Sequence, residues 1–394
     1  MLNPAAALSR LGTETAFEVL ARAKALETQG RSIINLGIGQ PDFTTAPNIV
    51  EAAIKALRDG HHGYTPSNGI APLRQSVAAH LEQRAGVPLD PDRVLIVPGG
   101  KVTMFFAILI CGEPGVEIIY PNPGFPIYES AIRFTGATPV PLPLEESNGF
   151  SFRAEALLER ISPRTRLIIL NSPANPTGGV SGRRELETVA AGLADRPDIA
   201  LLSDEIYGRI LYDGAEHVSL LSLPEIRDRV ILLDGWSKTY AMTGWRIGYS
   251  YWPEGLYQAA ERLAVNCHSC VNAAAQWAAI EALDGPQDMV DRMVQAFAER
   301  RRLVVDRLNA IDGVGCVAPG GAFYAFPNIT GTGMAAKTLE VELLEQAGVA
   351  TLAGTSFGRH GEGYLRLSYA NSLENIAEAL DRIERHLQAR RTAA

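Results

Sequence analysis

The chain has 394 residues, of which 46% are hydrophobic and 20% charged, and its formal net charge at pH 7 is −8. This length and composition are typical of a globular protein of about two or three domains. The acidic balance and the scattered Lys and Arg residues exclude an obvious nucleic-acid surface, and no apolar run approaches the ~20 residues that span a bilayer.

The first 24 residues predict an amphipathic helix rather than a signal peptide, because they lack a compact apolar core followed by a cleavage site. The cysteines are too few and too dispersed for a disulfide framework. We therefore expect a reduced, cytoplasmic protein. The four cysteines are Cys111, Cys267, Cys270 and Cys316.

Between about residues 90 and 255, short apolar runs alternate with segments that have apolar residues at helical spacing. The runs lack strict polar alternation, which indicates strands buried on both faces. Such a pattern predicts an α/β fold with a mostly parallel sheet between helices. The last two runs are too close for a crossover helix, so one antiparallel strand is expected. The seven predicted strands begin at Val94, Val116, Thr138, Arg166, Ile199, Val230 and Arg246.

The pattern changes from about residue 288. A long charged helical segment is followed by short strand-like pieces near residues 320–327 and 364–370, and then by a final helix. These elements predict a smaller α+β domain, on which the N-terminal helix packs. We expect a large domain of residues 45–287 and a small domain of residues 1–44 and 288–394.

Four of the predicted strands end in dense polar motifs, which read GGK, NSPANPTGG, DEIYGR and GWSKTY in chain order. In open parallel sheets, ligands bind beyond the carboxyl ends of the strands. The motifs therefore predict one shared ligand site. Their glycines, Asn, Asp, Tyr, Ser, Lys and Arg suit an anionic ligand with a reactive carbonyl.

The residue types also suggest a division of roles. The two glycines that end at Gly100 precede a predicted helix and would offer backbone N–H groups to a phosphate. Ser237 and Arg246 would add a hydroxyl and a bidentate cation. Lys238, partly desolvated beside Arg246, would favour its neutral amine and act as a Schiff-base nucleophile. Asp204 would hold a proton on a heterocyclic nitrogen, as pyridoxal phosphate chemistry requires.

The stretch GWSKTYAMTGWRIG, residues 235–248, resembles the lysine signature of the class I/II pyridoxal-phosphate-dependent aminotransferases of fold type I, the aspartate aminotransferase-like family. The resemblance runs from NLGIGQPDF at Asn35 to YLRLSYANS, which ends at Ser372. It implies a fold type I transferase with a mostly parallel seven-stranded sheet between helices and a smaller α+β domain. It also implies pyridoxal 5'-phosphate as cofactor, and a homodimer with shared active sites.

The resemblance further implies a role for each motif residue. Lys238 would carry the cofactor as a Schiff base and move the substrate proton, while Asp204 would pair with the ring nitrogen. Tyr207 and Asn175 would contact the phenolic oxygen, and Phe125 would stack on the ring. The phosphate would be held by the backbone amides of Gly100 and Lys101 and by the side chains of Ser237 and Arg246, with Tyr64 from the neighbouring subunit.

Lys101 carries the prediction about the substrate. Family members that accept dicarboxylic substrates resemble this chain in having GGK, with the lysine available to the distal carboxylate. Other aspartate aminotransferases use an arginine from the partner subunit, and residues 266–270 offer none. Arg366 would bind the α-carboxylate, assisted by Asn175 and the backbone near Gly39. We expect aspartate or glutamate as amino donor and a 2-oxo acid such as 2-oxoglutarate as acceptor, in a ping-pong reaction.

The motifs alone do not distinguish this reaction from those of other enzymes with the same fold. Aminotransferases for alanine or aromatic amino acids share the lysine, aspartate and arginine, as do fold type I carbon–sulfur β-lyases and cyclopropane-forming synthases. The G-x-S-x-G match at residues 354–358 lies outside the predicted sheet, so a serine-hydrolase site is not expected. Cys267 and Cys270 lack the second pair that a zinc site needs, and no metal is expected.

Overall fold

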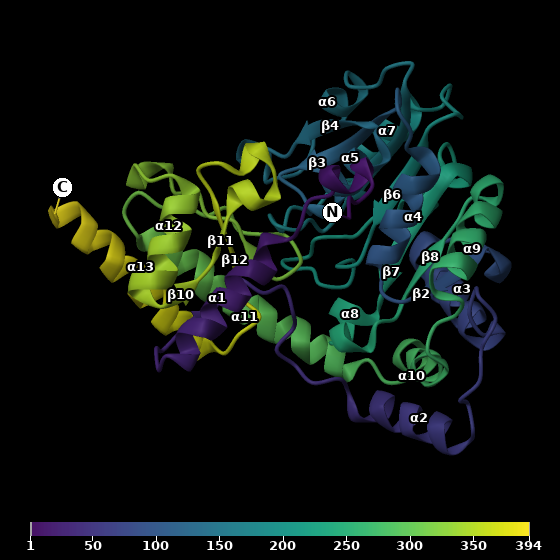
Figure 1. Cartoon of the computed structure of the whole chain (residues 1–394), viewed down its shortest axis with the longest axis horizontal. Helices are drawn as coiled ribbons and strands as arrows, with labels where there is room; N and C mark the ends of the chain where they lie inside the picture. Colours follow the sequence, from purple (N-terminus) through teal and green to yellow (C-terminus); the bar gives the residue numbers. More distant parts are fainter. Residues whose placement is uncertain (1, 394) are drawn as a thin grey trace.

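The larger lobe is built around one seven-stranded sheet in the computed structural model, which describes residues 2–393 (Figure 1). The strand order is β2-β8-β7-β6-β5-β3-β4, and β8 runs antiparallel to both of its neighbours. The mostly parallel sheet with one antiparallel strand confirms the predicted fold class. The strands are β2 (Val94–Val97), β3 (Glu117–Asn122), β4 (Thr138–Pro143), β5 (Thr165–Asn171), β6 (Ala200–Asp204), β7 (Val230–Gly235) and β8 (Gly248–Tyr251).

Helices cover both faces of this sheet, so successive strand residues enter two different cores. In β2, Val94 and Ile96 pack into the core under α3, α6, α7 and α10, whereas Leu95 and Val97 pack into the core under α4, α5 and α9. Burial on both faces explains the unbroken apolar runs in the sequence. The helices are α2 (Pro47–Arg58), α3 (Ala71–Ala85), α4 (Lys101–Cys111), α5 (Ile127–Thr135), α6 (Ala154–Leu158), α7 (Arg183–Gly192), α8 (Trp236–Thr239), α9 (Glu254–His268) and α10 (Ala273–Asp284).

The smaller lobe joins the two ends of the chain. Its core lies between the long helices α11 and α13 and two small sheets, an antiparallel one in the order β11-β12-β9 and a parallel pair of β1 and β10. Tyr207, Ile210 and Tyr212, which follow β6, also pack into this core. Its elements are β1 (Ile34–Asn35), α11 (Asp288–Ala310), β9 (Tyr324–Ala325), α12 (Ala336–Glu342), a π-helical turn (Leu343–Ala347), β10 (Val349–Ala350), β11 (Leu352–Ala353), β12 (Leu365–Ser368) and α13 (Leu373–Ala393).

The N-terminal segment differs from the predicted single helix. It forms a 3-10 helix, η1 (Ala6–Arg10), and a separate helix, α1 (Thr15–Thr28). The break falls at Gly12, whose backbone N–H donates to Ser130 Oγ on α5 at 2.8 Å instead of to a helical carbonyl. α1 packs on the small lobe, as expected, while η1 lies on the large lobe. Further 3-10 turns occur at Pro91–Arg93, Glu146–Asn148, Leu220–Ser222, Arg227–Arg229, Thr243–Trp245, Thr330–Thr332, Gly354–Phe357 and Arg359–Gly361.

The structure also bears on the cysteines and on membrane-spanning segments. All four cysteines are free thiols. Within residues 2–393, no helix is both long and apolar enough to cross a membrane.

A buried ionic network lies beneath the ends of β6 and β7. Arg84 of α3 pairs with Glu205, at 2.9 Å, and with Asp234. Glu205 also accepts hydrogen bonds from Ser203 and Ser219 and contacts His217 at 2.7 Å. Although burial opposes ionisation, His217 and Arg84 lower the pKa of Glu205 to about 2. One arginine therefore ties together the two strand ends.

Replacing Arg84 by Met should destabilise the fold strongly, because it leaves two buried carboxylates without their cation. We expect a loss of about 3–5 kcal/mol in the free energy of unfolding, measured by urea denaturation at pH 7. The control is Arg183→Met, which removes a surface pair with Glu187 at 3.9 Å and should cost at most about 0.5 kcal/mol. Equal losses in the two variants would contradict the role given to the network.

Candidate active site

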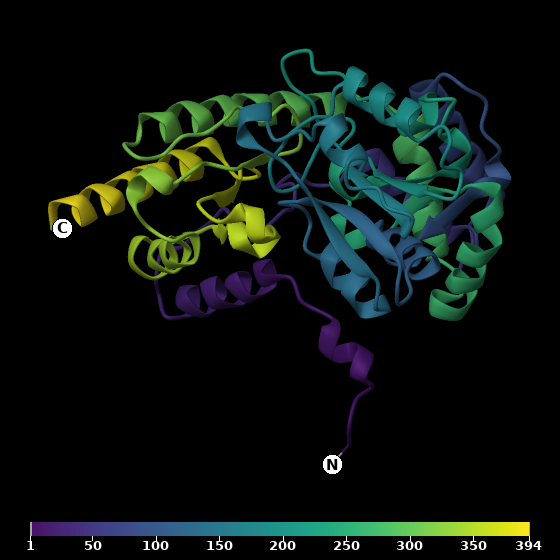
Figure 2. The ribbon, with the colours of Figure 1, turned by 90° about the horizontal axis from the view of Figure 1, so that it is seen from above.

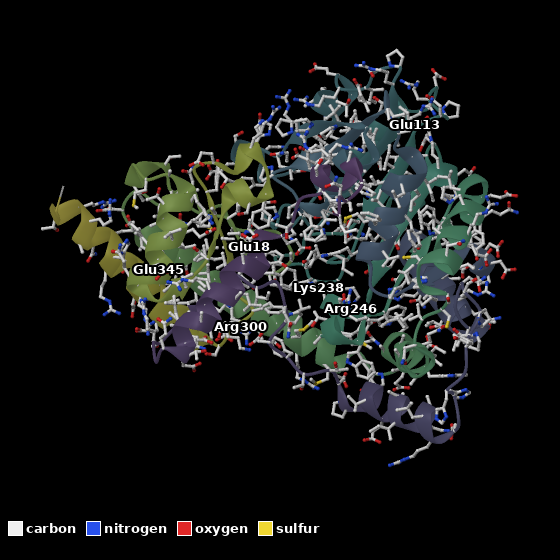
Figure 3. The ribbon with its side chains drawn as sticks, in the orientation of Figure 1. Glu18, Glu113, Lys238, Arg246, Arg300 and Glu345 are labelled. Atoms are coloured by element: carbon white, nitrogen blue, oxygen red, sulfur yellow. The ribbon has the colours of Figure 1, made fainter. Side chains whose placement is uncertain are left out.

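Three neighbouring strands bring their polar motifs to one edge of the sheet. Asn171 at the end of β5 is the register partner of Asp204 at the end of β6. β7 ends at Gly235, and α8 follows directly with Ser237 and Lys238. Lys238 and Arg246 lie between the two lobes (Figure 3). The strand ends therefore converge as the sequence predicts.

Lys238 is partly buried and has no carboxylate partner among the ion pairs of residues 2–393. Its Nζ donates to the carbonyl of Gly39 at 2.6 Å and lies 5.9 Å from the ring centroid of Phe323. Burial, together with the charges of Arg366 and Arg246, lowers the pKa of Lys238 to about 8. A neutral amine is therefore accessible near neutral pH, which suits a nucleophile or a general base.

Asp204 is a buried carboxylate at the floor of the site. It accepts a hydrogen bond from the Tyr128 hydroxyl at 2.6 Å and from the backbone N–H of Ile206 at 3.3 Å. Burial raises the pKa of Asp204 to about 6, although these hydrogen bonds lower it. A cationic group placed beside this carboxylate would favour its ionised form.

Two tyrosines complete this floor. The hydroxyls of Tyr207 and Tyr324 share a hydrogen bond of 2.8 Å, and both side chains are buried. Sequence reasoning selected Tyr207 but assigned no role to Tyr324 or to Tyr128. Tyr128 follows the predicted site residue Phe125 by three residues, and Tyr324 lies in the strand-like piece at residues 320–327. Their hydrogen-bond partners, Asp204 and Tyr207, come from distant segments of the chain.

Arg366 is a buried cation with one unsatisfied nitrogen. Its Nη1 donates to Asn175 Oδ1 at 3.0 Å and its Nη2 donates to the carbonyl of Gly37. Its Nε has no hydrogen-bond partner among residues 2–393, and the guanidinium lies 4.5 Å from the ring centroid of Tyr324. A buried arginine without a carboxylate partner is suited to bind an anion.

The segment of Gly37 and Gly39 contacts two of the predicted site residues. The carbonyl of Gly37 accepts from Arg366 and that of Gly39 accepts from Lys238, while the predicted contact of the backbone near Gly39 with the substrate α-carboxylate stays a prediction. A Cβ at Gly39 would overlap the Tyr324 hydroxyl. A glycine is therefore needed there because the two segments approach so closely.

A glycine cradle lies at the start of α4. Gly99 has φ +88°, and a Cβ on it would overlap the guanidinium of Arg246. A Cβ on Gly248 would lie 2.6 Å from the backbone nitrogen of Gly100. Arg246 itself adopts a left-handed backbone, with φ 51°, which costs about 1–3 kcal/mol and is typical of functional sites. With Ser237 one residue before Lys238, this donor set fits a phosphate whose carrier also has an aldehyde and a ring nitrogen.

Lys101, which is predicted to bind the distal carboxylate of the substrate, is paired with a carboxylate of the chain itself in this structure. Its ammonium forms an ion pair with Glu14 and lies 5.4 Å from the ring centroid of Phe125. Sequence reasoning missed Glu14 because it precedes Lys101 by 87 residues and belongs to no motif.

Tyr64 is not brought to the other site residues within one chain. Its side chain is 94% exposed. It borders a surface groove with Leu57, His61 and Cys270.

Comparisons with known proteins show to which family the chain belongs. The family model for aminotransferase class I and II matches residues 31–383. The aspartate aminotransferase of Geobacillus stearothermophilus is 37% identical over 97% of this chain and 98% of that protein. The solved aspartate aminotransferase of Rhizobium meliloti superposes with a TM-score of 0.94 at 34% identity, over 98% of this chain and 99% of that chain. The solved aspartate aminotransferase of Thermus thermophilus with maleate superposes with a TM-score of 0.93 at 34% identity, over 98% of this chain and 100% of that chain.

The fold and the site thus define a pyridoxal-phosphate-dependent transaminase. The chain belongs to the class I and II aminotransferase family. It acts on an amino acid and a 2-oxo acid, as the members of this family do.

The low pKa of Lys238 predicts the pH dependence of the reactivity of its amine in protein from which the cofactor has been removed. Acylation of Lys238, followed by mass spectrometry across pH, should have its midpoint near pH 8 rather than at the ordinary value of about 10.4. Arg246→Gln removes a charge that lowers the pKa of Lys238 and should raise the midpoint. Arg183→Gln on α7 should leave it unchanged. A midpoint above pH 10 in the parent protein would refute this electrostatic description.

Proposed function

We propose that the enzyme transfers the amino group of aspartate or glutamate to a 2-oxo acid such as 2-oxoglutarate in a ping-pong reaction. The observation that carries this proposal is a second cation in the site. Arg366 suits the α-carboxylate, and the ammonium of Lys101 lies beside Phe125 at the same site. A dicarboxylic substrate needs both cations. The aspartate aminotransferase relatives support the same substrate class.

Pyridoxal phosphate, when bound, supplies an electron sink that stabilises negative charge on the substrate α-carbon. We assign its ring nitrogen to Asp204 and its phenolic oxygen to Tyr207 and Asn175. The buried position of all three side chains supports the assignment. The remaining assigned contacts are Phe125 for the ring face, and Gly100, Lys101, Ser237 and Arg246 for the phosphate.

Lys238 is proposed as the catalytic residue. Its neutral amine would hold the cofactor, and the same amine is proposed to take the proton from the substrate α-carbon and to deliver it to the carbon on the other side of the transferred nitrogen. Such general-base help is worth about 10²–10⁴-fold in rate. Burial and the adjacent cations lower the pKa of the lysine amine to about 8, which makes its neutral form accessible, and Arg366 is proposed to orient the substrate through its α-carboxylate.

The assembly is also part of the proposal. The exposed side chain of Tyr64 suits a contact with the cofactor phosphate of a second copy, which makes the enzyme a homodimer with shared sites. The division into a large domain of residues 45–287 and a small domain of residues 1–44 and 288–394 remains a proposal, as does the cytoplasmic location.

An aminotransferase for alanine or aromatic amino acids is the second candidate. It is favoured by one observation, the ion pair between Lys101 and Glu14, because this pair neutralises the cation that a distal carboxylate would need.

Lys238→Ala tests the central assignment. The purified parent protein should show the visible absorbance of lysine-linked cofactor, and the variant should lack it because no other amine takes the place of Lys238. Transamination should fall by at least about 10²-fold. Lys55→Ala, on the exposed face of α2, should keep both the absorbance and the activity. A variant at Lys238 that retained the absorbance would rule out the assignment.

Lys101→Ala tests the substrate class. It removes the cation proposed for the distal carboxylate, so kcat/KM for aspartate should fall by about 10–100-fold, as for a lost hydrogen bond to a charged group. The value for alanine, which has no distal carboxylate, should change by less than about threefold. Lys101→Arg keeps a cation and should retain more of the aspartate activity. Equal losses for aspartate and alanine would refute the dicarboxylate proposal.

A further inference from the structure

Residues 10–15 form a strap between the two lobes. At one end, Arg10 Nε donates to the Arg133 carbonyl at 2.8 Å, and Gly12 is hydrogen-bonded to Ser130, so this end is fixed to α5. At the other end α1 begins at Thr15 and packs on the small lobe. Figure 2 shows this strap crossing between the lobes. Glu14 is thereby held at the junction between them.

Helix α1 does not fix the carboxylate of Glu14. Glu14 is the N-cap residue of α1, but its side chain makes no capping hydrogen bond. The carboxylate instead pairs with Lys101, and the Glu14 side chain is only 13% exposed whereas that of Lys101 is 45% exposed. The carboxylate is therefore sheltered, and the ammonium that it neutralises faces open space.

The same carboxylate acts on the catalytic residues. Besides burial, Arg366, Arg246 and Lys101 lower the pKa of Lys238, and Glu14 raises it. Glu14 also acts on the pKa of Arg366 and of Tyr324. The Glu14–Lys101 pair thus lies within electrostatic reach of Lys238 and of the proposed α-carboxylate site.

We propose that Glu14 is a specificity-determining residue that competes with the distal carboxylate of the substrate for Lys101. This inference rests on the proposed function, because it requires Lys101 to bind that carboxylate. With the pair intact, the site presents no net charge to a substrate side chain and accepts neutral ones. A dicarboxylic substrate binds when its distal carboxylate replaces Glu14 on the lysine.

The pair is suited to such an exchange. Partly exposed ion pairs are weak, so a substrate carboxylate can displace Glu14. The strap nevertheless keeps Glu14 close to Lys101, and a tethered group competes at an effective concentration on the order of millimolar. Glu14 therefore weakens dicarboxylate binding without abolishing it.

Maleate, an unreactive dicarboxylate, measures this competition without catalysis. We expect Glu14→Gln to lower the Kd of the cofactor-loaded enzyme for maleate, measured by calorimetry, by about fivefold or more. Glu18→Gln removes a carboxylate from the exposed first turn of the same helix (Figure 3) and should leave Kd within about twofold. In a Lys101→Ala background, Glu14→Gln should tighten maleate by a clearly smaller factor, because the cation for which the two carboxylates compete is gone and only the direct repulsion by Glu14 is relieved.

The kinetic readout should follow the binding readout. Glu14→Gln should raise kcat/KM for aspartate relative to alanine by the same factor as it tightens maleate. Equal changes for both amino acids, or a maleate Kd that falls by less than about threefold, overturn the inference.

The failures of the two proposals are distinguishable. If Lys101→Ala leaves maleate binding intact, the dicarboxylate proposal fails, and the role of Glu14 fails with it. If Lys101→Ala weakens maleate binding but Glu14→Gln does not tighten it, only the role of Glu14 fails.

Discussion

The rest of the structure depends on the separation of two adjacent buried carboxylates, Asp204 and Glu205, at one edge of the large sheet. Successive residues of an extended strand point in opposite directions, and at the end of β6 this separates two neighbouring carboxylates. Asp204 accepts from Tyr128, whereas Glu205 pairs with Arg84. The same arginine holds Asp234, four residues before Lys238. A structural ionic network and a chemical site therefore share the same strand ends.

Environment, rather than residue type, separates the properties of these two carboxylates. Glu205 has a cation and a histidine beside it, so its pKa is lowered to about 2 although it is buried. Asp204 has a phenol and no cation, and burial raises its pKa to about 6. The first stays ionised and supports the fold. The second can gain stability from a cationic group on a ligand, which is the property that a cofactor-binding carboxylate needs.

The sequence predicts what depends on local patterns. Apolar runs located all seven strands, and the polar motifs after them located Asp204, Lys238 and Asn175 at one edge. Contacts between distant segments were not predictable from such patterns. The Tyr207–Tyr324 hydrogen bond, the Glu14–Lys101 pair and the break of the first helix at Gly12 each depend on a partner more than 80 residues away. The residue types in a motif do not reveal which of its side chains form an ion pair or a hydrogen bond with a distant part of the chain, as Lys101 does with Glu14.

The strap at residues 10–15 precedes the part of the chain that carries the family's motifs. The match to the family model spans residues 31–383, so it includes Lys101 and leaves out Glu14. Under the role proposed for Glu14, two enzymes with the same GGK motif can differ in charge at this point, one presenting a free cation to a substrate side chain and the other a neutral ion pair. The strap, which contains none of the catalytic motifs, therefore has a proposed part in selecting the amino acid.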